Sequence, residues 1–385
     1  MIKENNSRYH AFNIVYQFDS TKHQLKSIRH EYYRKNNTSP SERSRSMVLS
    51  NEVVRWQRRL DSWISLSLDK PIKKLPPKVL SILRLAYYEY IMDDNIPVHA
   101  AVDSWVELSK KITNKKLSGL INAVLRKAHS INKKMPIPNQ DLASWQSFPD
   151  WMIANWVNQF GKSKTNKLID YLNQSHGTDL RINLPIDKVE SRLLDQGISW
   201  SKSPNSKNFI RINSGLRKIL SSQIHLSGKV FVQNRAAGAV VEILNPKPSE
   251  TILDVCAAPG TKSIYIFQKM NQSGNLFASD INSSQVAKSF KRCNELELSI
   301  DWKVKDATKD IFPMADRILI DAPCTGTGVI SRNPDIKWRK DSKDTDKMSA
   351  YQIKILFHIS KFLKNNGVIV YATCSMENQE NWNVI

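Results

Sequence analysis

Cysteine is scarce in this sequence, and its few cysteines do not form a metal-binding motif. The 385 residues contain four cysteines and no CxxC pair. A zinc ribbon or a disulfide scaffold is therefore not expected in a chain of this length. We expect reduced thiols and no bound metal. The cysteines all lie in the last third of the chain, at Cys256, Cys293, Cys324 and Cys374.

Long apolar runs and familiar phosphate-binding motifs are also missing. No stretch of about 18 apolar residues occurs, and the amino terminus has no hydrophobic signal core, so membrane insertion is not expected. We therefore expect a cytoplasmic protein. The patterns GxxxxGK[ST] and GxGxxG are absent too, and neither a P-loop nor a dinucleotide fingerprint is predicted.

Acidic residues are few compared with basic ones. The chain has 57 Lys and Arg against 36 Asp and Glu, a net charge of +21. Residues 1–135 hold 25 of the basic and 12 of the acidic side chains, and so +13 of this excess. Neutralising phosphates supplies most of the affinity for nucleic acid, so we predict that this region docks RNA or DNA. A solvated charged surface is the alternative for any single lysine.

Hydrophobic periodicity divides the chain into three predicted parts. Residues 1–135 repeat apolar side chains at three- and four-residue spacing, which indicates an all-helical domain. A proline-containing linker at 130–140 leads into residues 136–225, a predicted small α+β module. Residues 226–385 alternate apolar strands with long helices, beginning with a strand at "VFVQ". This alternation predicts an α/β, Rossmann-like domain with a doubly wound parallel sheet.

Reactive side chains follow five successive strands of the predicted sheet. Ligands of such sheets bind beyond the carboxyl ends of the strands. A single aspartate there is more often a helix cap or a turn former, but five such positions in register predict one site. They are Asp254 to Cys256, Asp280, Asp306, Asp321 with Cys324, and Cys374.

The turn after the first of these strands is suited to close approach of a ligand. Small residues dominate it, so backbone amides are accessible: Cys256, Ala257, Ala258, Pro259, Gly260, Thr261 and Lys262. Asp280 ends the next strand, where an acid can hold both hydroxyls of a ribose; capping the following helix is its alternative role. A ligand with a ribose and no phosphate cradle fits S-adenosylmethionine.

Several motifs resemble those of a known enzyme family. The segments "ILDVCAAPGTKS", "ASDIN", "VKDAT", "LIDAPCTGTGVISRNPDIKW" and "VYATCSMEN" are similar to the successive motifs of the Sun/Nop family of RNA cytosine-5 methyltransferases. The segments "HAFNIVYQF", "SILRLAYYEYI" and "LINAVLRKA" resemble a NusB-like RNA-binding domain. The resemblance implies S-adenosylmethionine-dependent methylation of carbon 5 of a cytidine in small-subunit (16S) ribosomal RNA. We expect a monomer.

The resemblance also implies a role for each candidate residue. Carbon 5 of cytosine is a poor nucleophile, so a thiolate must first add at carbon 6, and a second thiol can assist the later elimination. Spacing alone does not assign the two thiols; the resemblance gives attack to Cys374 and release to Cys324. Asp321 would hold the ring nitrogen edge and help carry a proton. The remaining implied contacts are the cofactor with residues 256–262, Asp280, Asp306 and Asp321, and RNA phosphate with Arg332 and Arg339.

Two departures from the family lead to further expectations. The family usually has glycine where Thr261 stands, and a β-branched residue disfavours positive φ, so the turn is expected to differ. The family also continues beyond Ile385, so the domain at 226–385 is expected to be incomplete at its C terminus.

Two other functions remain open from the sequence. A DNA cytosine-5 methyltransferase would attack with Cys324, although Thr325 replaces the glutamine of its typical Pro-Cys-Gln context. A non-catalytic RNA-binding assembly factor would need only the helical domain.

Overall fold

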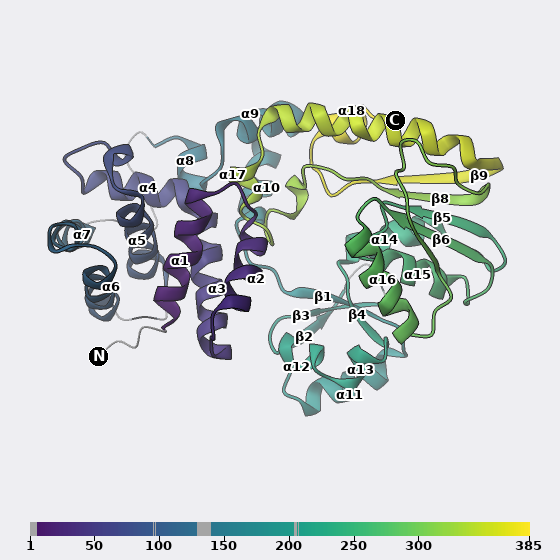
Figure 1. The fold of residues 1–385 in the computed structure, drawn as a ribbon, viewed down its shortest axis with the longest axis horizontal. Helices are drawn as coiled ribbons and strands as arrows, with labels where there is room; N and C mark the ends of the chain where they lie inside the picture. The colour runs from purple at the N-terminus through teal and green to yellow at the C-terminus, as the bar shows by residue number, and fades with distance from the viewer. Residues whose placement is uncertain (1–5, 95, 97, 129–139, 204–205, 207) are drawn as a thin grey trace. The chain divides into compact units, whose positions relative to one another are not determined.

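The computed structural model describes residues 6–94, 96, 98–128, 140–203, 206 and 208–385 (Figure 1). The linker predicted at 130–140 therefore lies, except for residue 140, outside the described residues. The chain forms two compact units, Met1–Gln174 with Thr327–Ser342, and Ser175–Gly326 with Lys343–Ile385. No helix within the described ranges is both long enough and apolar enough to cross a membrane.

The first unit is helical. Helices α3 and α4 are separated at Trp56, and α5 continues into a π-helical turn at Tyr88–Met92. The helices are α1 (Ser7–Ser20), α2 (Leu25–Lys35), α3 (Pro40–Arg55), α4 (Gln57–Leu66), α5 (Pro77–Tyr87), α6 (Val98–Ile112), α7 (Lys115–Lys127), α8 (Leu142–Gln146), α9 (Asp150–Phe160), α10 (Lys162–Leu172) and α17 (Ile336–Arg339). Helix α2 has a narrow apolar stripe, and its buried residues are Leu25, Ile28 and Tyr33.

Helices α8 to α10 pack with the first unit, although the sequence analysis assigned them to the 136–225 module. Arg58 of α4 donates to the carbonyl oxygen of Phe148 at 2.8 Å and to Asp150 Oδ1 at 2.9 Å. The Arg59 guanidinium lies over the Trp145 ring at 3.7 Å. These contacts join segments roughly ninety residues apart, and the periodicity of a single helix does not indicate them.

The second unit contains a small antiparallel sheet of order β2-β3-β1-β4. Its strands are β1 (Thr178–Ile182), β2 (Trp200–Lys202), β3 (Phe209–Ile212) and β4 (Val230–Val232), with helices α11 (Ile186–Asp195), α12 (Leu216–Leu220) and α13 (Gln223–Leu226). The placement of "VFVQ" in the parallel sheet was wrong: β4 pairs antiparallel with β1, Val230 opposite Ile182. Three apolar residues give no period that distinguishes the two sheets.

The parallel sheet has the order β7-β6-β5-β8-β9. Its strands are β5 (Thr251–Val255), β6 (Asn275–Asp280), β7 (Asp301–Val304), β8 (Ala315–Asp321) and β9 (Leu363–Ala372). The chain runs outward from β5 to β7 and then returns to β8 on the other side of β5. The order thus reverses between β5 and β8, which is where a ligand crevice is expected.

Helices cover both faces of this sheet, as the Rossmann-like prediction required (Figure 1). On one face, Ile252 and Leu319 pack with α14 (Arg235–Leu244), α15 (Thr261–Lys269) and α16 (Ser283–Glu295). On the other, Leu253 and Ile318 pack with α18 (Ser342–Ile359). Successive residues of a strand point to opposite faces, so these nearly continuous apolar strands supply both cores.

Candidate active site

The parallel strands bring the candidate residues to one edge of the sheet. Strands β6 and β8 end at Asp280 and Asp321, and the turn beginning at Cys256 follows β5 directly. Cys324 and Cys374 lie just after β8 and β9. Because β5, β8 and β9 are adjacent and parallel, these loops emerge side by side at the point where the strand order reverses.

The sulfur atoms of Cys324 and Cys374 are 3.1 Å apart, although fifty residues separate them in sequence. Both are free thiols, and Cys374 is the more exposed. A hydrogen bond from the Cys324 thiol lowers the pKa of Cys374 by stabilising its thiolate. The same contact, together with burial, raises the pKa of Cys324. The pair is therefore asymmetric, with Cys374 as the first thiol to ionise.

Lys262 forms an ion pair with Asp321 next to the thiols. Lys262 lies in the first turn of α15, and its side chain is 17% exposed against 31% for Asp321. The lysine charge also contributes to the lowered pKa of Cys374, whereas Asp321 opposes it. An accessible ion pair and a thiolate-forming cysteine thus share this edge.

The turn at 256–262 places its positive φ angles at Cys256 (59°) and Gly260 (90°). A Cβ atom at Gly260 would lie 3.0 Å from the Trp302 ring, so both the φ angle and the close approach call for glycine. Thr261 instead begins helix α15. The expected disturbance at Thr261 is therefore absent, because this position has helical geometry.

Cys256 belongs to this turn but not to the reactive pair. Burial, together with the nearby carboxylates of Asp280 and Asp254, raises the pKa of its thiol to about 12. Its thiol is therefore neutral near pH 7 and contributes to the turn mainly through its backbone.

The aspartates of this edge differ in how many hydrogen bonds their carboxylate oxygens already accept from the protein. Asp280 accepts the Ala258 N–H at 3.2 Å and the Asn282 N–H at 2.9 Å, one on each carboxylate oxygen. Each oxygen keeps a further lone pair for a ligand. Asp306 accepts the backbone N–H and the hydroxyl of Thr308 on one oxygen, at 2.9 and 2.7 Å. This is the turn-forming role that single aspartates often take.

Asp254 is buried completely at the base of the turn at 256–262. Desolvation raises the pKa of its carboxyl to about 7, while the Ser263 hydroxyl donates to it at 2.6 Å. Its other oxygen has no hydrogen-bond partner within the described residues. Asp254 therefore lies beneath the site as a carboxyl that titrates near pH 7.

Arg332 and Arg339, predicted to contact RNA phosphate, lie in the segment Thr327–Ser342, which packs with the helical unit. Arg332 is exposed. Arg339 donates to the carbonyl oxygens of Phe18 at 2.6 Å and His23 at 3.0 Å, with its guanidinium 3.6 Å from the Phe18 ring centre. Its donors are therefore used within the protein.

The sequence analysis did not single out the buried charged residues near the candidate motifs, among them Glu380 and Lys337. Glu380 and Lys337 are 0% and 1% exposed, and each bonds several segments of the chain. Glu380 lies in the polar run "SMENQE" and Lys337 in "NPDIKWR". Neither run has an apolar period, so no sequence signal indicated burial.

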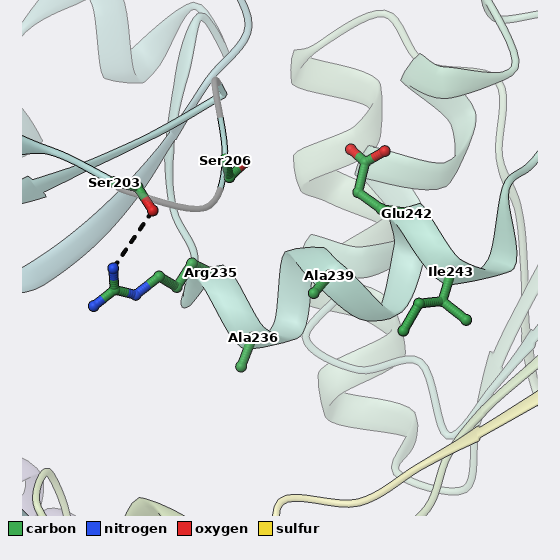
Figure 2. Close-up of a pocket in the computed structure, with 7 residues that line it drawn as sticks. All are labelled: Ser203, Ser206, Arg235, Ala236, Ala239, Glu242 and Ile243. Atoms are coloured by element: carbon green, nitrogen blue, oxygen red, sulfur yellow. Dashed lines mark hydrogen bonds between the residues drawn. The ribbon is translucent and has the colours of Figure 1, made fainter.

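A separate cavity of about 480 Å³ lies beside α14 (Figure 2). Ala236, Ala239 and Ile243 form its apolar wall, and Arg235, which donates to Ser203 Oγ at 3.4 Å, forms a polar end. Figure 2 shows that none of the predicted site residues lines it. The cavity is thus distinct from the strand-edge site.

Comparison with known proteins agrees with this arrangement. The protein-family model described as 16S rRNA methyltransferase RsmB/F matches residues 241–385, and the family model for NusB matches residues 5–130. The chain is 33% identical to the probable ribosomal RNA small subunit methyltransferase B of Synechocystis sp., over 89% of this chain and 80% of that protein. The protein of the same name from Bacillus subtilis is 30% identical over 88% and 76%.

The chain belongs to the RsmB/F family of rRNA methyltransferases. The crystal structure of PH0851 shares the fold with a TM-score of 0.78, at 22% identity over 98% of this chain and 87% of that one. NSun6 from Pyrococcus horikoshii with SFG, an S-adenosylmethionine analogue, gives a TM-score of 0.56 at 19% identity over 62% and 86%.

The cofactor of this RsmB/F family member is S-adenosylmethionine. The residues at the strand edge fit it. Gly260 opens the turn for backbone approach, and Asp280 retains acceptors at the end of β6 where a ribose is expected. No group of three or more side chains suited to a metal ion occurs in the ranges that the structure describes.

Proposed function

We propose that this RNA methyltransferase methylates carbon 5 of a cytidine in small-subunit ribosomal RNA through a covalent cysteine adduct. The proposal depends chiefly on one observation, the two free thiols 3.1 Å apart beside the Lys262–Asp321 ion pair. A methyltransferase acting on an exocyclic amine or a hydroxyl needs no such pair, whereas carbon 5 must be made nucleophilic by addition at carbon 6. The names of the curated relatives support small-subunit rRNA as the substrate.

In the first step, Cys374 attacks carbon 6 as a thiolate. Its lowered pKa and greater exposure favour it over Cys324 as the nucleophile. Asp321 holds the ring nitrogen edge, and a proton passing from the Lys262 ammonium through Asp321 to the ring nitrogen prevents a ring anion from forming. The carbon–sulfur bond and this proton together turn carbon 5 into an enamine carbon.

When bound, S-adenosylmethionine supplies the electrophilic methyl group. Residues 256–262 and Asp280 would hold it, with Asp306 near the adenine. The chain's own task is then to expel the sulfur of Cys374 and remove the proton of carbon 5.

Cys324 carries out this second task. Its pKa is raised chiefly by the hydrogen bond to Cys374, and that cause disappears once Cys374 is a thioether. Cys324 can then lose its own proton to water and take the proton of carbon 5 as a base. The electrons of the C–H bond form the ring double bond, Cys374 leaves as a thiolate, and the proton on the ring nitrogen returns through Asp321 to Lys262.

The target base must leave its stack, since carbons 5 and 6 are not open to in-line attack in a stacked helix. The NusB-family domain at residues 5–130, which carries much of the basic excess, is proposed to dock the RNA.

The test uses wild type, Cys324→Ala and Cys374→Ala, each incubated with ribosomal RNA and S-adenosylmethionine and separated on a denaturing gel. Protein–RNA adduct should accumulate only with Cys324→Ala, because attack proceeds and release fails. Accumulation only with Cys374→Ala would exchange the two roles. The absence of both adduct and methyl transfer in all three folded proteins would refute the proposal.

A further inference from the structure

One buried carboxylate contacts the turns of both thiols. Glu380, in the 3-10 turn η6 (Asn378–Glu380), is completely buried. Its Oε1 accepts the backbone N–H of Thr325 at 2.8 Å and Nε2 of Gln352 at 3.1 Å. Its Oε2 accepts the hydroxyls of Thr325 and Ser375. Four donors from three segments thus converge on two oxygens.

The donors are placed next to the reactive sulfurs. Thr325 directly follows Cys324, and Ser375 directly follows Cys374. Gln352 Nε2 also donates to the carbonyl oxygen of Pro323 at 2.8 Å, so the Cys324 turn is held on both sides. The Thr325 and Ser375 hydroxyls are themselves 3.3 Å apart. Any displacement of one turn relative to the other must break a bond to Glu380.

A buried carboxylate is a costly way to join two loops. Its desolvation is offset only when its lone pairs are satisfied, and apolar packing of similar volume is often at least as stabilising. Hydrogen bonds to a carboxylate are shorter and more directional than apolar contacts, so they specify a geometry. This arrangement therefore favours positional accuracy of the two turns over stability alone.

We propose that Glu380 is a positioning residue that holds the turns of Cys324 and Cys374 so that both sulfurs reach one base. Glu380 itself acts through Thr325, Ser375 and Gln352. The inference rests on the proposed function for the roles of the two thiols. The positioning of their turns by Glu380 can nevertheless be measured without RNA or cofactor.

The measurement is the effective concentration of one thiol at the other. Purified protein is equilibrated with glutathione and its disulfide, and the Cys324–Cys374 peptide pair is quantified by mass spectrometry after acid quenching. Two protein thiols are oxidised to one disulfide while glutathione disulfide is reduced to two glutathione molecules, so the equilibrium constant reports the proximity of the two sulfurs.

Glu380→Ala should lower this effective concentration at least tenfold, because the turns lose their common acceptor. In Glu380→Gln the effective concentration should stay within about threefold of wild type. The hydroxyls of Thr325 and Ser375, which donate to the carboxylate, can instead accept hydrogen bonds from the new amide nitrogen. Rescue by the isosteric variant distinguishes positioning from the charge.

The matched control is Asp316→Ala, at the opposite end of β8. Asp316 also joins segments, accepting the Thr251 N–H at 2.8 Å and Lys364 Nζ at 2.9 Å. It should leave the effective concentration within about twofold of wild type, whatever its effect on thermal unfolding.

An effective concentration in folded Glu380→Ala equal to that of wild type would overturn the inference. If Glu380→Ala does not fold, the double variant Thr325→Val, Ser375→Ala answers the same question, because it keeps the carboxylate and removes the hydroxyl donors. It should reduce the value at least threefold, and no reduction would equally overturn the inference. If the wild-type protein shows a high effective concentration of the two thiols but no methyl transfer, the proposed function is refuted. The positioning role of Glu380 is then still supported.

Discussion

Two lysines, one in each compact unit, have opposite surroundings. Lys337 in α17 is 1% exposed, and its Nζ donates to three neutral groups: Asn173 Oδ1 at 2.7 Å, Ser147 O at 3.0 Å and Arg55 O at 3.2 Å. Desolvation, with the Arg55 charge as the next cause, lowers its pKa well below the usual range. Lys262 instead pairs with Asp321 and remains partly accessible.

The difference shows that the surroundings of a lysine decide whether it stabilises the fold or takes part in chemistry. Without an acid partner, a buried lysine is held by its hydrogen bonds and loses the tendency to stay charged. With an accessible carboxylate beside it, a lysine keeps a charge that can act on a neighbouring thiol. Lys337 therefore joins segments of the helical unit, whereas Lys262 lies where its charge lowers the pKa of Cys374.

The largest effect is expected from Lys262→Met. The hydrogen bond from Cys324 and the Lys262 charge both lower the pKa of Cys374, so removing the charge raises it. The single-turnover methylation rate should fall about 10²- to 10⁴-fold near neutral pH. Because the thiolate is the reactive form, the rate should recover partly as pH rises, which a profile from about pH 6 to 9 would show.

The control for Lys262→Met is Lys269→Met on the same helix. Lys269 pairs with Glu242 at 3.0 Å, away from the thiols. An unchanged rate and pH profile in Lys262→Met would remove the proposed contrast between the two lysines.

Lys337→Met should act on stability instead. It leaves two buried carbonyls and an amide oxygen without their donor, so unfolding should become easier by about 1–3 kcal/mol, measured by urea denaturation. Lys164→Met, at an exposed position on α10, should change stability by less than about 0.5 kcal/mol. A fully stable Lys337→Met would show that the buried hydrogen bonds contribute nothing.

The pH dependence of stability sharpens this prediction. The folded pKa of Lys337 is lowered, so between that value and its unfolded value of about 10.4 the unfolded chain binds more protons. Wild-type stability should therefore rise with pH across this window relative to Lys337→Met. A difference between the two proteins that does not change with pH would contradict the lowered pKa.

Arg339 and Arg332 offer a comparison within one segment. Arg339→Met should lower the free energy of unfolding by about 1–2 kcal/mol, because two carbonyl oxygens and an aromatic face lose their cation. Arg332→Met, at an exposed position, should lower stability less than Arg339→Met does and reduce the salt dependence of RNA binding by about one unit of slope. Equal stability losses would show that the exposed arginine is structural as well.

The smallest effect is expected from Thr261→Gly. Since Thr261 begins α15 with helical geometry, glycine brings no conformational relief and should cost at most about 1 kcal/mol. The dissociation constant for S-adenosylmethionine, measured by calorimetry, should change less than about threefold. Tighter binding by tenfold would show that threonine does disturb the turn.

Much of the fold and part of the site were predictable because the relevant signals are local. The apolar runs of β5 and β8, each followed by a polar residue or a small-residue turn, indicated a parallel sheet and its ligand edge. The assembly of Asp321 and Cys324 near Cys374 follows from that sheet. Strand β4 was assigned to the wrong sheet, because its apolar run is too short to distinguish the two sheets.

The sequence by itself determined the alternation of strands and helices, the basic helical region and the residues that end each strand. These depend on side-chain periods within a single element. Only the tertiary structure decided that Glu380 joins the two thiol turns, that Lys337 is buried, and that Thr261 avoids positive φ. Burial of a charge depends on donors and acceptors far away in the chain, and no local pattern of polar residues specifies them.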